Sequence, residues 1–105
     1  MAILDEIDLA LLTDFQKKVL SRLNALLIER NLRALVQIVE LEKKGSYLGD
    51  CYVHVEIPER RIEVWAYSDE IGITVDGQFS LLERTRRETD SSMISKYFAD
   101  LEILL

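Results

Sequence analysis

The region between residues 35 and 83 constrains the fold most, because it consists of short strand-like segments joined by very short connections. β-branched and aromatic residues alternate there with polar ones, which is typical of strands with one buried face. Strands are expected at residues 35–41, 47–57, 62–67, 71–75 and 79–83. Parallel neighbours would need crossover connections of about a dozen residues or more, so these strands should pair as antiparallel hairpins in a meander.

A helical pattern is expected on each side of the strand region. Thr13 and Gln16 form a capping-box pattern at the start of an apolar stripe, and Asn31 can adopt the left-handed conformation that ends a helix. The last helix should begin near Thr89 and carry its own apolar stripe: Ile94, Tyr97, Phe98, Leu101 and Leu104. The pattern predicts one α+β domain over residues 1–105, a two-layer fold in which a five-stranded antiparallel β-meander is flanked by an N-terminal and a C-terminal helix.

The Asp76-Gly77 pair allows two hairpin loops with different consequences. A two-residue type I′ loop would turn Phe79 and Leu81 toward the face that carries Trp65. A three-residue loop with Gly77 in a bulge would keep both side chains on the core face. It would pair Ile73 with Phe79 and Ile71 with Leu81. We expect the bulge, because it buries all four apolar side chains.

The face opposite the core is the candidate functional surface. If the turn at Pro58 pairs Ile57 with Ile62, then Glu56 faces Glu63, His54 faces Trp65, and Tyr52 faces Tyr67 across the two strands. The predicted partner-binding residues are Asp50, Tyr52, His54, Glu56, Glu63, Trp65 and Tyr67.

Two physical features favour binding on this face. Facing glutamates repel each other, and an approaching Lys or Arg would remove that repulsion. Tyr and Trp are also the residue types that concentrate binding energy at protein interfaces. A purely structural role is the alternative, because cross-strand aromatic pairs stabilise sheets by themselves and Trp65 could shield the bare Gly72 on the next strand.

The sequence contains little that indicates catalysis or cofactor binding. Cys51 and His54 lie three residues apart in one strand, so their side chains should point to opposite faces. There is no zinc-type ligand spacing, no Gly-rich phosphate loop before a helix and no nucleophile elbow. Glu56 and Glu63 on an open sheet face would be poorly tuned for acid–base work. We therefore expect no enzyme activity, no cofactor and no metal site.

The charge balance narrows the choice of partner. Nineteen Asp and Glu against 13 Lys and Arg give a net charge of −6, which disfavours nucleic acid and favours a cationic protein. No apolar run approaches the roughly 18 residues of a membrane span, and the acidic N-terminus is unlike a secretory signal. The single cysteine is consistent with a reducing compartment. We expect a cytoplasmic protein that contacts neither membrane nor nucleic acid.

The strand at 35–41 is apolar on both faces although a meander leaves it at an edge of the sheet. Edges of this kind attract other strands. Residues 2–12 could cover it, or it could pair with a second copy in a homodimer. A homo-oligomeric structural or adaptor domain is therefore an alternative function, and a small-molecule-binding α+β domain is a third.

The organisation of residues 13–105 resembles the immunity proteins of bacterial contact-dependent and polymorphic toxin systems. The shared features are a helix, then a meander with a W-x-Y strand (Trp65 to Tyr67) and an E-I-G-I-T-V-D-G hairpin (Glu70 to Gly77), then a short amphipathic helix. The resemblance implies a non-catalytic inhibitor that neutralises a toxin, such as a basic nuclease, by binding it directly. These families share no universal functional residues, so no site is carried over position by position.

Overall fold

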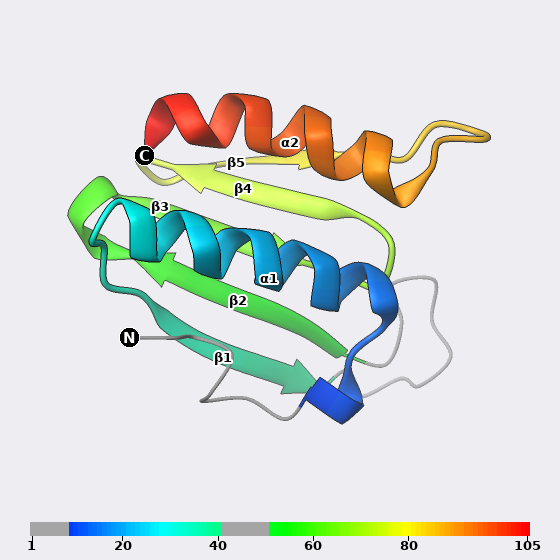
Figure 1. Ribbon diagram of the computed structural model, residues 1–105, viewed down its shortest axis with the longest axis horizontal. Coiled ribbons are helices and arrows are strands. Elements are labelled where there is room, and N and C mark those ends of the chain that lie inside the picture. Colours follow the sequence, from blue (N-terminus) through cyan, green and yellow to red (C-terminus); the bar gives the residue numbers. More distant parts are fainter. Residues whose placement is uncertain (1–8, 41–50) are drawn as a thin grey trace.

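The computed structural model describes residues 9–40 and 51–105, and it confirms the predicted α+β architecture (Figure 1). The five strands form one antiparallel sheet in the order β1-β2-β3-β4-β5, with every neighbour adjacent in sequence. The elements are η2 (Leu9–Leu11), α1 (Asp14–Glu29), β1 (Leu35–Glu40), β2 (Cys51–Ile57), η3 (Pro58–Arg60), β3 (Ile62–Ala66), β4 (Ile71–Val75), β5 (Gln78–Leu82) and α2 (Asp90–Leu104).

Both helices lie on the same face of the sheet, which gives the two predicted layers (Figure 1). The core fills the space between these layers. Its fully buried side chains come from alternate positions of the central strands and from one stripe of each helix: Val19, Leu20 and Leu23 of α1, Val53, Val55 and Ile57 of β2, Val64 of β3, Ile71 of β4, and Met93, Phe98 and Leu101 of α2. One face of the sheet is therefore covered by helices, while the other carries no described helix or strand.

Both ends of α1 form as the sequence predicts. Thr13 Oγ1 accepts a hydrogen bond from the backbone N–H of Gln16 (3.2 Å), and Gln16 Oε1 accepts one from the N–H of Thr13 (2.9 Å). This reciprocal pair is the capping box. After the helix, Asn31 adopts the left-handed conformation with φ at 53°.

Gln16 also connects α1 to the sheet, a role that the sequence pattern did not reveal. Its side chain is only 1% exposed, and Nε2 donates to the carbonyl oxygens of Cys51 (3.0 Å) and Ala66 (3.1 Å). Those carbonyls belong to two different strands. One amide group therefore satisfies the helix end, β2 and the end of β3 together.

The apolar stripe of α2 differs from the prediction in its last turn. Ile94, Tyr97, Phe98 and Leu101 are buried as expected, but Leu104 is 40% exposed and Leu105 is buried instead. Leu105 lies four residues after Leu101 and its N–H still donates to the carbonyl of Leu101 (2.9 Å), so it continues the buried face.

Tyr97 anchors α2 to β4. Its hydroxyl donates to the carbonyl oxygen of Gly72 (2.9 Å), and burial raises the pKa of the phenol well above its usual value. We expect Tyr97→Phe to lower the free energy of unfolding by about 1–2 kcal/mol at pH 7, because the carbonyl of Gly72 loses this donor. Denaturant unfolding measures this loss.

The same variant should respond differently to alkali. In the parent, Tyr97 ionises more readily when unfolded, so its contribution is present below about pH 10 and is lost as the pH rises further. The Tyr97→Phe variant lacks this contribution and should show a shallower loss of stability above pH 10. Parallel curves for the two proteins would contradict a buried, protonated Tyr97.

The carboxylate of Glu88 connects the turn before α2 to the first turns of the helix. It accepts hydrogen bonds from Thr85 and from Ser92 Oγ (2.9 Å) and pairs with Lys96. The contacts with Lys96 and Ser92, and then with the backbone of Thr85, lower the pKa of Glu88 from 4.5 to about 2.

The lowered pKa of Glu88 predicts a specific acid sensitivity. Its contribution should be present above about pH 4.5, where the unfolded carboxyl is ionised, and should be lost as the pH falls toward 2. Glu88→Gln should therefore melt lower than the parent at pH 7, and the difference should shrink between pH 4.5 and 2. The control is Glu59→Gln on the exposed η3 turn, which removes the same charge and none of these contacts.

The β4–β5 hairpin corrects the prediction of a bulge. Asp76 and Gly77 both have positive φ, at 50° and 83°, and Val75 pairs directly with Gln78, so the loop has two residues. This geometry matches the right-handed twist of the flanking strands, and Asp-Gly adopts it readily. Phe79 and Leu81 therefore lie on the same face as Trp65, and the expected burial of both in the core is wrong.

The missing side chain of Gly72 leaves room for the Phe79 ring on the face opposite the core. A Cβ atom on Gly72 would lie 2.8 Å from Cε1 of the Phe79 ring, so the ring occupies the room that the missing side chain leaves. The apolar contact that the bulge would have made in the core is thus replaced by a contact on the opposite face.

Candidate protein-binding face

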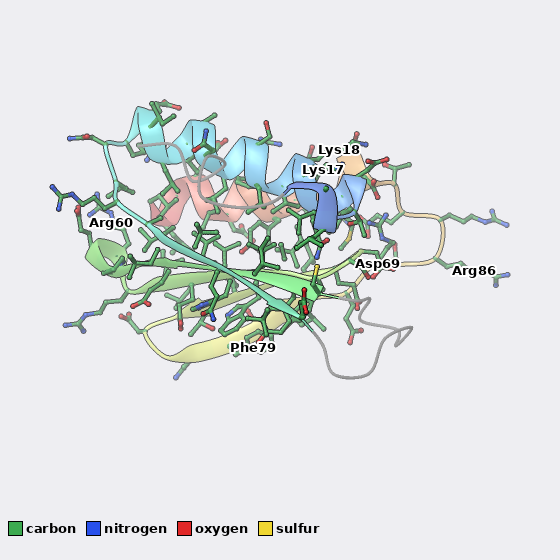
Figure 2. All side chains as sticks on the ribbon, turned by 90° about the horizontal axis from the view of Figure 1, so that it is seen from below. Lys17, Lys18, Arg60, Asp69, Phe79 and Arg86 are labelled. Atoms are coloured by element: carbon green, nitrogen blue, oxygen red, sulfur yellow. The ribbon has the colours of Figure 1, made fainter. Side chains whose placement is uncertain are left out.

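The candidate site is the sheet surface that faces away from the helices, called the open face below. Figure 2 shows Phe79 on this side, whereas Lys17 and Lys18 lie on the helical side. The outward positions of the five strands, with Tyr67 just after β3, are Leu35, Gln37, Val39, Tyr52, His54, Glu56, Glu63, Trp65, Gly72, Thr74, Phe79 and Leu81. None of these positions is Lys or Arg.

The predicted register across β2 and β3 is confirmed. Glu56 pairs with Glu63, His54 with Trp65, and Ile57 with Ile62. The rings of Tyr52 and Tyr67 lie 5.6 Å apart between centroids. Six of the seven predicted site residues therefore gather on the open face, and Asp50 lies outside the described residues.

Trp65 lies at the centre of an aromatic cluster. Its indole stacks on the His54 ring at 4.2 Å between centroids, and the Tyr52 and Phe79 rings lie at 6.0 and 6.3 Å. Its Nε1–H donates to Oγ1 of Thr74 (2.9 Å) on the neighbouring strand. The indole is thus held in one orientation, which would lower the entropy cost of any binding through it.

The two facing glutamates have different surroundings. Glu63 Oε1 lies 2.8 Å from Nε2 of His54, so the repulsion expected from the sequence is partly relieved on this side. The carboxylate of Glu56 makes no ion pair within the described part of the chain. Glu56 is therefore the acid on this face that a cationic partner could pair with directly.

Tyr67 closes the aromatic cluster at the end of β3. Partial burial, and then the neighbouring Tyr52, raise the pKa of its phenol. The hydroxyl group therefore stays protonated at neutral pH. A protonated phenol can donate a hydrogen bond to a partner and contribute its ring to the contact.

A cleft of about 340 Å³ lies at one end of the open face. Glu56, Glu63 and Asp76 contribute its acids, Arg61 contributes one base, and apolar residues such as Pro58 contribute the rest of the wall. The acidic end of the open face therefore lies beside the β2–β3 and β4–β5 turns.

Phe79 and Leu81 belong to the open face although the prediction placed them in the core. Phe79 is 54% exposed and Leu81 38% exposed. The Asp76-Gly77 pair was the signal that could have identified them, because it favours the two-residue loop. They extend the apolar surface around Trp65 as far as the β5 edge of the sheet.

Cys51 and His54, which were considered as a nucleophile and its base, lie on opposite faces of the sheet. Cys51 is buried on the core side with Sγ 3.3 Å from the carbonyl oxygen of Leu11, and His54 lies on the open face. Among residues 9–40 and 51–105, no cluster of His, Cys, Asp or Glu could hold a metal ion. No helix in the same ranges is long and apolar enough to cross a membrane.

The strand edge at β1 is described only in part. Val36 and Ile38 are half-buried against the core, whereas Leu35 on the open face is 64% exposed. Of residues 2–12, which were one expected cover for this strand, residues 2–8 lie outside the described residues. Both the covered edge and the β1 dimer stay predictions.

Comparison of the chain with protein-family models, curated proteins and solved structures finds no match in any of the three.

Proposed function

We propose that this chain is a non-catalytic, immunity-protein-like inhibitor that neutralises a basic toxin, such as a nuclease, by binding it directly on the open face. The observation that carries the proposal is the composition of that face. It combines a preorganised aromatic cluster with two glutamates, and no Lys or Arg occupies an outward strand position.

The aromatic side chains supply the contact energy in this proposal. The helical side of the sheet already holds the hydrophobic core, so the Trp65 cluster is additional apolar surface on the far side. Phe79 leaves more than half of its surface exposed. Trp and Tyr anchors surrounded by polar groups are the usual pattern of binding hot spots.

The acids supply selectivity for a cationic partner. A nuclease binds its polyanionic substrate with Lys and Arg, and Glu56, which lies beside Glu63, is positioned to pair with the same basic side chains. The net charge of −6 would also accelerate association with a basic protein. An inhibitor bound in this way blocks the substrate-binding surface without any chemical step.

The decisive experiment uses the toxin candidate encoded beside this gene in its native genome. Purified toxin domain is titrated with this chain in a calorimeter, and toxin activity is measured over the same titration. We expect stoichiometric binding and inhibition, and co-expression should restore growth of cells that carry the toxin. A candidate that is inhibited equally well when Trp65 is changed to Ala and Glu56 to Lys would contradict the open face as the site.

A charge reversal on the open face tests the cationic character of the partner. Glu56→Lys should slow association about tenfold at low salt, with a smaller effect at high salt, because the new ammonium group repels the approaching partner. Glu29→Lys at the exposed end of α1 makes the same change in net charge on the helical layer and is the matched control. Stopped-flow association rates at two ionic strengths measure both. If both variants slow association equally, then the association rate depends on net charge and not on the position of Glu56.

A further inference from the structure

Among the residues that the structure describes, no strand pairs with the outer edge of β5. The N–H of Asp76 donates to the carbonyl oxygen of Arg61 (3.1 Å), so this residue bonds toward β3. Hydrogen bonding alternates along an antiparallel strand, so Val75 and Ile73 bond toward β5. Their partners there are Gln78 and Ser80. Phe79 and Leu81 therefore point their backbone N–H and C=O groups away from the sheet.

The composition of β5 does not protect this edge. Edge strands are usually guarded by charged side chains, by proline or by a bulge. Residues Gln78–Leu82 contain no charge and no proline, and the adjoining turn has no bulge. The edge is therefore suited to pairing with another strand.

A cleft of about 550 Å³ runs between β5 and α2. Ile73, Ser80 and Leu82 line it from the sheet, and Tyr97 and Ala99 line it from the helix. Lys96 and Asp100 also line the α2 side. The cleft has an apolar wall and carries one charge of each sign, four residues apart.

We propose that a second copy of this chain pairs with β5, so that the two sheets join across a twofold axis. Centring the axis on Ser80 makes Phe79 pair with the partner's Leu81, and Leu81 with the partner's Phe79. This register connects the backbone groups that point outward. It also places two exposed apolar side chains of each copy, 54% and 38% exposed, next to those of the other copy, so that the two open faces become continuous.

Lys96 and Asp100 of α2 would form reciprocal ion pairs across the same twofold axis. Tyr97 bonds to Gly72, and Gly72 pairs with Leu81, so the middle of α2 lies level with the middle of β5. Antiparallel helices related by that axis bring Lys96 toward the partner's Asp100, and Asp100 toward the partner's Lys96. A twofold interface requires this self-complementarity, because every contact occurs twice.

The reciprocal charges favour a second copy over an unrelated strand. An extended segment from any protein could form hydrogen bonds with the edge of β5. It would not supply a helix whose charges pair with both Lys96 and Asp100. Asp100 makes no ion pair among the described residues, and Lys96 contacts Glu88 only. Both side chains are exposed, so a neighbouring helix can reach Asp100 directly and can share the ammonium group of Lys96 with Glu88.

The first test is the oligomeric state of the purified chain by sedimentation equilibrium and light scattering. We expect a dimer, and we expect Leu81→Pro to convert it to monomer, because proline removes an outward N–H while the bonds to β4 remain. Leu81→Val is the matched control, since it keeps the N–H, and it should remain dimeric. Circular dichroism reports whether each variant is folded.

A charge exchange provides a second test that does not alter β5. Asp100→Lys alone should raise the dimer dissociation constant about tenfold, because Lys96 then faces a second lysine twice. Lys96→Asp alone should also weaken the dimer, and because it also removes the pair with Glu88, circular dichroism checks that this variant remains folded. Mixing the two variants should restore dimerisation as a heterodimer, because each copy then carries one sign of charge.

Three results would overturn the proposal. The first is a parent that stays monomeric at the highest soluble concentration. The second is a dimer that withstands both Leu81→Pro and the charge variants, which would place the contact elsewhere, with β1 as the next candidate. The third is a monomer in which Leu81→Pro abolishes toxin binding, which would mean that β5 receives a strand of the toxin.

Discussion

Replacing Gln16 with alanine is expected to destabilise the domain by about 3 kcal/mol. The change removes the donor for the carbonyl oxygens of Cys51 and Ala66 in a site that is 1% exposed. It also removes the side-chain acceptor for the N–H of Thr13. Each buried polar group left without a partner costs about 1–3 kcal/mol, and a lost cap adds to that.

Urea unfolding at pH 7 measures the effect. Gln37→Ala on β1 is the matched control, because Gln37 is exposed and the same atoms are removed. We expect the control to change the free energy of unfolding by less than about 0.5 kcal/mol. A Gln16→Ala variant with the stability of the control would mean that Gln16 does not hold α1 on the sheet.

If the proposed function is right, replacing Trp65 with alanine is expected to weaken binding of the proposed toxin by about 2 kcal/mol or more, which is roughly a 30-fold increase in the dissociation constant. The indole is the centre of the aromatic cluster, and its removal leaves Thr74 without the Nε1 donor and His54 without its stacking partner. For the same reason the variant should also lose some stability. Calorimetric titration well below the melting temperature separates the two effects.

Tyr97→Phe is the control for that separation. It destabilises the helical side of the sheet without changing any side chain of the open face. We expect it to bind the proposed toxin as the parent does, whereas Trp65→Ala should not. Equal loss of affinity in the two variants would show that Trp65 acts through folding alone.

Local sequence determines much of this fold. Thr13 with Gln16 and Asn31 set the two ends of α1, and Thr89 accepts from the N–H of Ser92 (3.1 Å) at the start of α2. Short connections impose antiparallel pairing. The turn after Ile57 then sets the β2–β3 register, so the grouping of His54, Trp65 and the facing glutamates could be predicted without a structure.

Contacts between distant residues decided the rest. The second role of Gln16 depends on carbonyls 35 and 50 residues further along the chain, and periodicity carries no information about them. The partner of Glu63 is a diagonal neighbour, His54, because side-chain reach and orientation matter as well as register. Neither contact leaves a local pattern.

The β4–β5 hairpin shows most clearly what the sequence pattern could not predict. Counting apolar residues favoured a bulge that buried Phe79, but the sequence alone could not show that Gly72 leaves room for that ring on the other face. The Asp76-Gly77 backbone preferred the two-residue loop, and because strand side chains alternate, a one-residue change in the loop moved Phe79 and Leu81 together. Sequence therefore determined which strands pair, while tertiary packing decided how far the aromatic surface extends.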